Sequence, residues 1–356
     1  MTLQALPRSP PLPSHWPGLA SAGGWVLALL LVALVVAVTL GAVHVAPADW
    51  WAPLSTDDLS GGAYVLWNLR LPRALLAAAV GAALGLCGAL TQGLFRNPLA
   101  DPGLLGVTSG AACAAALVLT VFSGAQWVIP PAWRLWLLPV SAFVGALLVC
   151  VVLERMARWL TPGSISGLLL TGLALNAITM SVVGLCSYLA TDEQLRSLTF
   201  WTLGSLASAS WGVVGVLSIA LVLCTWRARR LAHALNALAL GEASAAHVGV
   251  NVPRLRIGLI AIVALLSALA VAWCGLIGFI GLMAPHLVRG IAGADQRRLL
   301  PLAMVAGALL LLVADTVART VAMPAEIPVG IFTALIGGPG FLLLLRGVAR
   351  QQGGHA

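Results

Sequence analysis

Long apolar segments recur along almost the whole chain, and they decide what it can fold into. A bilayer-spanning helix needs about 20 apolar residues in succession, and ten segments meet or approach that length. They are residues 24–46, 71–95, 103–122, 135–158, 165–190, 208–226, 255–273, 275–292, 299–322 and 327–347. Only 8% of the residues are charged, against about 25% in a soluble domain. The segments therefore predict an all-α, polytopic membrane protein with ten transmembrane helices.

The segments divide the chain into one membrane domain with short ends. Residues 1–22 hold five prolines and little periodicity, which is typical of a disordered tail. We expect the transmembrane domain to cover 23–350, with a cytoplasmic loop at 227–256 and a short cytoplasmic tail at 351–356. The first apolar segment is too long for the core of a signal peptide, so it is predicted to remain as a membrane span.

The arginines predict the orientation of the segments. Basic residues concentrate in cytoplasmic loops of membrane proteins. With the N-terminus inside, all but five arginines fall on the inner side, and most of the acidic residues fall outside. The outer arginines are Arg70, Arg73, Arg134, Arg196 and Arg319. This distribution supports ten spans with both termini in the cytoplasm.

The basic residues also exclude some chemistry. The chain has 19 basic residues, and every one is an arginine. Without lysine there is neither a P-loop nor a Schiff-base lysine, so any ATP-driven work requires a separate ATPase subunit. The six cysteines lie apart in apolar stretches and the six histidines are scattered, so no metal site is predicted and no cofactor is expected on this chain.

Small residues mark the second segment as a packing helix. Gly81 and Gly85 form a G-x-x-x-G motif, and Gly88 follows. This spacing lets helix backbones approach closely in a membrane. It predicts a tightly packed bundle around residues 71–95.

Several polar groups near the membrane surfaces have two interpretations each. Arg70, Arg73 and Arg319 oppose the positive-inside bias; they either pair with acidic groups on an extracytoplasmic partner or an anionic substrate, or extend from helix ends toward the headgroups. Ser164 and Ser166 either line a pathway or cap a helix. The segment LALGEASAAHVGVN (238–251) predicts short helices, in a loop that is either a docking surface or a basic tether.

Several stretches together resemble one family. These are RLPRALLAAAVGAALGLCGALTQGLFRNPLADPGLLGVTSGA (70–111), WTLGSLASASW (201–211), LALGEASAAHVGVN and the region from GFIGLMAPHLVRG (278–290) to residue 346. They are similar to the FecCD permeases, which import iron–siderophores, haem or vitamin B12 in ATP-binding-cassette (ABC) transporters. The resemblance implies a type II importer permease in the bacterial inner membrane, working as a homodimer with two cytoplasmic ATPase subunits and a periplasmic binding protein. ATP and Mg²⁺ would bind to the ATPase.

The resemblance also implies roles for individual residues. Arg70, Arg73 and Arg319 match arginines that meet acidic residues of the binding protein. Asn97 and Leu99 match the cytoplasmic gate. Ser164 and Ser166 belong to a second gate layer, although Ile165 and Ser166 stand where the vitamin B12 permease has two hydroxyl residues. The residues that match the ATPase-docking loop are Gly241, Glu242, Ser244, Ala245 and Gly249.

The transported ligand is predicted from the residues of two motifs. QGLFRNPLADPG and WTLGSL are most similar to haem permeases, with siderophore permeases close behind and cobalamin permeases further away. Arg196 is a candidate contact for haem propionates; alternatively it pairs with Asp192 or Glu193.

Two other functional classes fit the sequence less well. An ion-coupled secondary transporter needs acidic or histidine relays inside the bilayer, whereas Asp315 and Glu326 fall at an outer helix end and no segment has a central carboxylate. An intramembrane enzyme needs a nucleophile with its base, or a metal motif such as H-E-x-x-H. Neither is present in the sequence, so we expect a transport subunit that is not itself an enzyme.

Overall fold

The fold is known from a computed structural model, which describes residues 19–52, 61–123 and 130–353. These residues form helices joined by short connections, and no strand occurs among them. Most of the predicted N-terminal tail, residues 1–18, lies outside the described residues.

A helix lies on each of the ten predicted segments. The helices are α1 (Leu19–Thr39), α3 (Leu71–Phe95), α4 (Val107–Leu119), α6 (Pro131–Leu160), α7 (Ile165–Leu189), α9 (Trp211–Ala239), α11 (Val252–Cys274), α12 (Ile280–Ala292), α13 (Gln296–Thr320) and α14 (Val329–Gly353). Six described helices are long and apolar enough to cross a membrane, and four shorter apolar helices lie on the first, third, eighth and tenth segments.

Some boundaries differ from the sequence prediction. α9 continues to Ala239, so residues 227–239 are helical and the loop proper begins only at Leu240. Alanine, leucine and arginine favour helix, and the first residue that breaks the pattern is Gly241, with φ +112°. A further helix, α8 (Asp192–Thr202), fills what was predicted as a loop.

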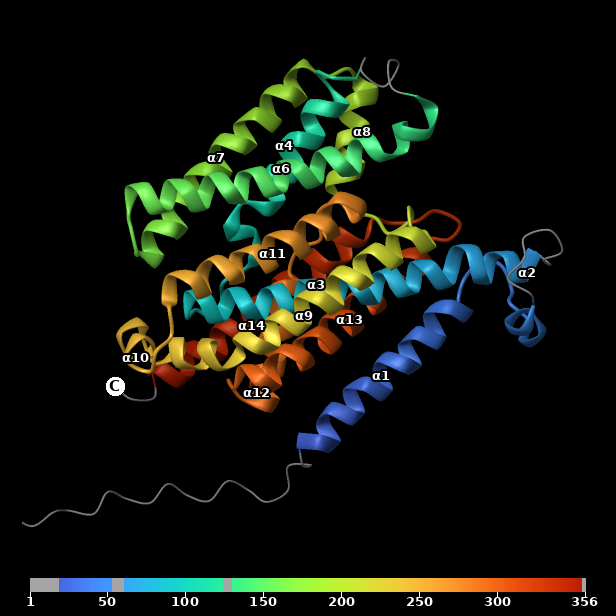
Figure 1. Cartoon of the computed structure of the whole chain (residues 1–356). Coiled ribbons are helices and arrows are strands. Elements are labelled where there is room, and N and C mark those ends of the chain that lie inside the picture. The colour runs from blue at the N-terminus through green and yellow to red at the C-terminus, as the bar shows by residue number, and fades with distance from the viewer. Residues whose placement is uncertain (1–18, 53–60, 124–129, 354–356) are drawn as a thin grey trace, which may run out of the picture.

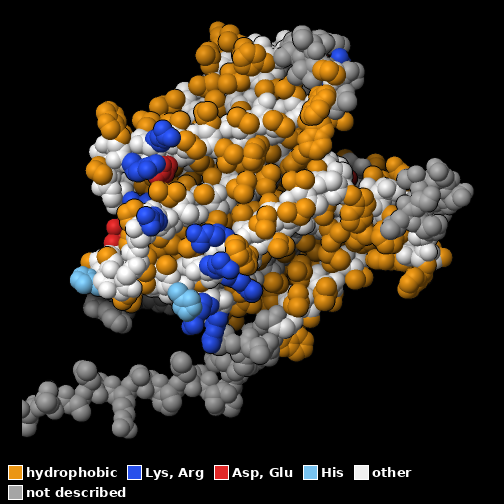
Figure 2. Space-filling view, viewed as in Figure 1, with side chains coloured by type: hydrophobic (Ala, Val, Ile, Leu, Met, Phe, Trp, Pro, Cys, Tyr) orange, Lys and Arg blue, Asp and Glu red, His pale blue; other side chains and the backbone are white. Residues whose placement is uncertain are grey.

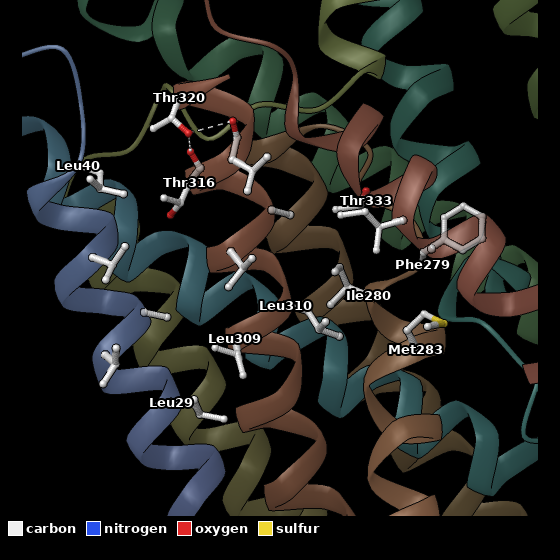
Figure 3. A pocket seen from close by; sticks show the side chains of 18 residues that line it. Leu29, Leu40, Phe279, Ile280, Met283, Leu309, Leu310, Thr316, Thr320 and Thr333 are labelled. Carbon is white, nitrogen blue, oxygen red and sulfur yellow. Dashed lines mark hydrogen bonds between the residues drawn. The ribbon is translucent and has the colours of Figure 1, made fainter. Parts of the chain in front are cut away.

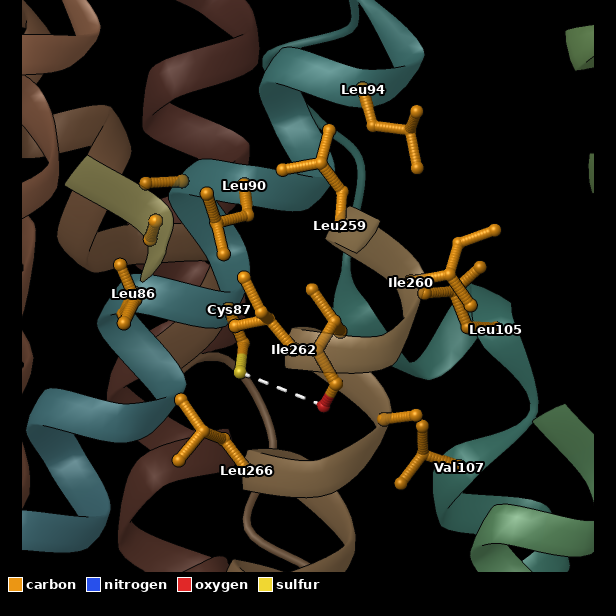
Figure 4. Close-up of a cluster of buried hydrophobic side chains, with 14 of the residues drawn as sticks. Leu86, Cys87, Leu90, Leu94, Leu105, Val107, Leu259, Ile260, Ile262 and Leu266 are labelled. Carbon is orange, nitrogen blue, oxygen red and sulfur yellow. Dashed lines mark hydrogen bonds between the residues drawn. The ribbon is translucent and has the colours of Figure 1, made fainter. Parts of the chain in front are cut away.

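α3 is the centre of the bundle. It packs against α9, α11, α12 and α13, and Figure 1 shows it running between them. Its leucines interlock with those of α11, as Leu86, Leu90, Leu259 and Leu266 do in Figure 4. A Cβ atom at Gly81 would collide with the carbonyl oxygen of Gly307 in α13. The predicted close approach of backbones at this motif is therefore confirmed.

The outer helices expose apolar side chains instead. Leu170 and Leu173 of α7 are 67% and 66% exposed, and the visible face in Figure 2 is mostly apolar, with arginines gathered toward one end. Such a surface is unstable in water but suits lipid or a partner helix. The basic end contains the exposed residues Arg227, Arg229, Arg230, Arg254, Arg297 and Arg298. Following the predicted orientation, we call it the inner end and the opposite end the outer end; the orientation itself stays a prediction.

Candidate docking surfaces and gate

The outer end of the bundle contains a network of ion pairs around Arg73. Its guanidinium binds both carboxylate oxygens of Asp315 in α13, with Nη2 2.9 Å from Oδ1 and Nε 3.1 Å from Oδ2. Nη1 donates to Glu326 Oε2 at 2.7 Å. The Asp315 side chain is only 2% exposed. This two-point geometry is the strongest arrangement available to an arginine and a carboxylate.

Arg70 and Arg319 act on the C-terminal end of α1. Arg70 lies in a π-helical segment (Val65–Arg70) that leads into α3, and it donates to the carbonyls of Val38, Thr39 and Val43. Arg319 donates to the carbonyls of Ala37 and Leu40. The last carbonyls of a helix lack partners within the helix, and cations stabilise this end of the helix dipole. The two arginines therefore cap α1.

The three arginines predicted to dock a binding protein are thus brought together. They line one outer hollow of about 350 Å³ with Glu326, whose side chain is 49% exposed. Each arginine already has acceptors within the chain, so its charge is stabilised even where the predicted orientation places it on the outer side. Their docking role stays a prediction, and Asp315 and Glu326 are functional candidates that sequence reasoning treated only as possible relay groups.

Arg196 lies on α8, away from this network. It is exposed, and among the described residues no ion pair joins it to Asp192 or Glu193. α8 itself is fixed by a capping box between Thr191 and Gln194, and by a hydrogen bond of 3.0 Å from the Gln194 amide to the Ser123 hydroxyl. Contact with a ligand stays a prediction for Arg196.

The predicted ATPase-docking residues form a compact cap at the inner end. Helix α10 (Glu242–His247) follows α9 after Gly241, and Ala245 is fully buried against the bundle. Ser244 is exposed, and Leu240 and Val248 beside the helix are 79% and 69% exposed. The predicted short helix is confirmed. Exposed apolar side chains next to a basic surface are suited to contact with another protein.

Glu242 forms an ion pair with an arginine of the same chain. Its Oε1 accepts a hydrogen bond of 3.1 Å from Nη2 of Arg256 in α11. The sequence placed Glu242 in the docking set but gave no sign of this partner. The ion pair is partly exposed, with side-chain exposures of 16% for Arg256 and 36% for Glu242.

The predicted gate residues lie at two helix ends of the inner end: Asn97 and Leu99 in the turn after α3, and Ser164 and Ser166 at the start of α7. Asn97 Oδ1 accepts the backbone N–H of Leu99 at 2.9 Å and so holds the turn after α3. Ser164 caps α7 by accepting the N–H of Gly167 at 3.0 Å, which supports the capping interpretation for this residue. Ser166 is exposed. In the same turn as Asn97, burial raises the pKa of the Asp101 carboxyl.

One apolar groove runs between α1 and helices α12, α13 and α14 (Figure 3), with a volume of about 660 Å³. Its hydroxyl groups belong to Thr316, Thr320 and Thr333, and each donates to a carbonyl of its own helix. Among the described residues that line it, the groove offers no free polar group that would select a ligand. Among the described residues there is also no cluster of metal-binding side chains.

The sequence that forms these helices matches a known family. A model of the FecCD transport family matches residues 29–347. The chain belongs to the FecCD transport family. It is therefore a multi-pass membrane permease of the ABC-transporter type, as the sequence motifs predicted, and is expected to work with ATPase and substrate-binding partners.

Individual relatives agree over almost the full length of this FecCD chain. The hemin transport system permease protein HmuU of Yersinia pestis is 43% identical over 93% of this chain and 97% of its own. The vitamin B12 import system permease protein BtuC of Escherichia coli O157:H7 is 38% identical over 90% and 94%. A solved metal-chelate type ABC transporter in an inward-facing conformation is 32% identical, with a TM-score of 0.78 over 92% of this chain and 99% of that one.

Proposed function

We propose that this FecCD chain is the permease subunit that moves haem from the periplasm to the cytoplasm in an ATP-driven importer. The observation that carries the proposal is the 43% identity to a hemin permease over nearly the whole of both chains. The motifs QGLFRNPLADPG and WTLGSL, which are similar to those of haem permeases, agree with it. Iron–siderophore is the second candidate, because the solved relative is a metal-chelate type transporter.

The proposed architecture is a homodimer of ten-span subunits with both termini in the cytoplasm. The exposed apolar sides of the outer helices support a partner subunit as well as lipid contact. Two ATPase subunits would dock on Gly241, Glu242, Ser244, Ala245 and Gly249 around α10. Their closure on ATP would open the cytoplasmic and periplasmic ends of the pathway alternately, with Asn97, Leu99, Ser164 and Ser166 at the inner gate.

Reconstitution tests the substrate and the energy source together. The purified permease, with its ATPase and binding protein, is placed in proteoliposomes and supplied with hemin, a ferric siderophore or cobalamin. We expect ATP-dependent uptake of hemin above the other two. Preferential uptake of a ferric siderophore or of cobalamin would replace haem as the proposed substrate. Uptake that does not depend on ATP would contradict the proposed ATP-driven importer.

The outer arginines are proposed to receive acidic groups of the binding protein. Arg73 is the most informative, because its Nη1 is held by the half-exposed Glu326. Glu326→Ala removes this acceptor altogether, leaves the buried pair with Asp315 in place and frees Nη1 of Arg73 for a partner. We expect tighter binding of the binding protein, measured on immobilised permease. Unchanged affinity would contradict docking at Arg73.

The proposed haem contact at Arg196 has a matched control on the same helix. Arg196→Gln should reduce hemin uptake by lowering the affinity for the propionates, whereas Glu193→Gln should not. Equal hemin uptake by wild type and Arg196→Gln would contradict the proposed contact between Arg196 and the propionates.

A further inference from the structure

Arg256 joins three parts of the inner end that are separate in the sequence. It lies in the second turn of α11, and its Nη2 donates to Glu242 Oε1 in α10 at 3.1 Å. The same nitrogen donates to the carbonyl oxygen of Gly163 at 3.2 Å. Gly163 belongs to the turn between α6 and α7. One guanidinium nitrogen, which carries two hydrogens, therefore bridges the docking helix and the start of α7.

The two ends of this bridge are positioned by local structure. Glu242 is the first residue of α10, which is held against the bundle by the buried Ala245. Gly163 adopts φ +81°, a conformation that glycine tolerates best. In this conformation its carbonyl oxygen points toward Arg256 and accepts the hydrogen bond from Nη2. The next residue, Ser164, caps α7. A displacement of Gly163 therefore acts directly on the first turn of α7.

Arg256 is held for these contacts at a cost. Its side chain is only 16% exposed, and its Nε is buried without a hydrogen-bond partner among the described residues. A buried unpaired donor is unfavourable, so packing alone does not account for an arginine here. Arg254, two residues earlier on the same helix, is exposed and makes no side-chain ion pair among the described residues.

We propose that Arg256 is a positioning residue that transmits the movement of α10 to the turn before α7, and so to the inner gate at Ser164 and Ser166. This inference rests on the proposed docking of an ATPase at α10. When ATP draws the docked helices together, α10 moves with the ATPase, and the Glu242–Arg256–Gly163 bridge pulls on the start of α7.

The test compares Arg256→Gln with Arg254→Gln in the full complex, and reads the gate directly. A reporter cysteine replaces the exposed Ser166, and its maleimide labelling is measured with and without a non-hydrolysable ATP analogue. The native cysteines are buried or partly buried, so their labelling is a low background. In wild type and Arg254→Gln, we expect nucleotide to change the labelling rate. In Arg256→Gln, the change should fall by roughly tenfold or more, as for the loss of a hydrogen bond to a charged group, while the ATPase still copurifies.

Two outcomes would overturn the proposal. One is an equal nucleotide response in Arg256→Gln and Arg254→Gln. The other is a folded Arg256→Gln chain that no longer binds the ATPase, since Arg256 would then serve docking alone. If Arg256→Gln does not fold, Glu242→Ala removes the acceptor at the other end of the bridge, and an unchanged response in that variant, with the ATPase still bound, rejects the proposal. Absence of ATPase binding to wild type would instead reject the proposed function, and the bridge with it.

Discussion

The arginines at the two ends of the bundle have different surroundings. At the outer end, Arg70, Arg73 and Arg319 are fixed by carbonyls and carboxylates of the same chain. At the inner end, residues such as Arg229 are exposed. The positive-inside rule disfavours an arginine on the outer side of the membrane. These three arginines, which are predicted to lie there, have partners in the chain that stabilise their charge. An inner arginine follows that rule and does not require a partner. Arg229 stays accessible to the headgroups and to other proteins, whereas Arg256 and Arg297 pair with Glu242 and Asp295.

The largest effect is expected at the centre of the outer network. Asp315→Ala would leave Arg73 and Arg319 largely buried without their shared carboxylate. Breaking a buried ion pair from one side costs about 3–5 kcal/mol. Unfolding of the purified permease in detergent, induced by heat or by denaturant, should show this loss of stability. The neighbouring Thr316→Ala is the control, because Thr316 only bonds to its own helix. Similar losses in both variants would mean that the network does not stabilise the outer end.

The next effect concerns the cap of α1. Arg70→Ala removes three carbonyl contacts, and hydrogen bonds that involve a charged group contribute about 1.5–3 kcal/mol. Hydrogen exchange should rise in the last turn of α1 more than in α3. Arg70→Lys should lie between wild type and Arg70→Ala, since it keeps the charge but not the forked donors. Uniform exchange across both helices would argue against a cap.

A smaller effect is expected at the inner end, where Asp295 caps α13 beside Arg297 and Asn236. Hydrogen bonds from Arg297 lower the pKa of this carboxyl well below its usual range. A lowered pKa in the folded state means that the contribution is complete above the unfolded value of about 4 and is lost as the pH falls further. As the pH is lowered, the melting temperature should therefore decline less steeply in Asp295→Asn than in wild type. Parallel curves would contradict this prediction.

The smallest effect is expected for Arg229, an inner arginine that has no side-chain partner among the described residues. Arg229→Gln should change stability by no more than about 0.5 kcal/mol, measured under the same conditions as Arg70→Ala. A loss as large as that of Arg70→Ala would remove the distinction between the two ends.

The helices could be predicted from the sequence because each depends on a local apolar pattern. Thr191 and Gln194 also carried a local signal, the capping box that begins α8, and it was overlooked because this short helix is amphipathic and its segment is not apolar enough to span. The outer network could not be predicted. Arg73 is separated from Asp315 by 242 positions and from Glu326 by 253, and no local pattern pairs residues at such distances. The bridge at Arg256 was missed for the same reason, since Gly163 is 93 positions away.

The central position of α3 has a consequence for biosynthesis. α3 ends at Phe95, but its principal neighbour α13 begins only at Gln296. During translation α3 therefore leaves the translocon long before the helices that enclose it exist. It must wait in lipid, or beside the insertion machinery, with Gly81 and Gly85 facing no partner. Assembly of this permease is thus completed late, when the C-terminal third of the chain closes around a helix made near its start.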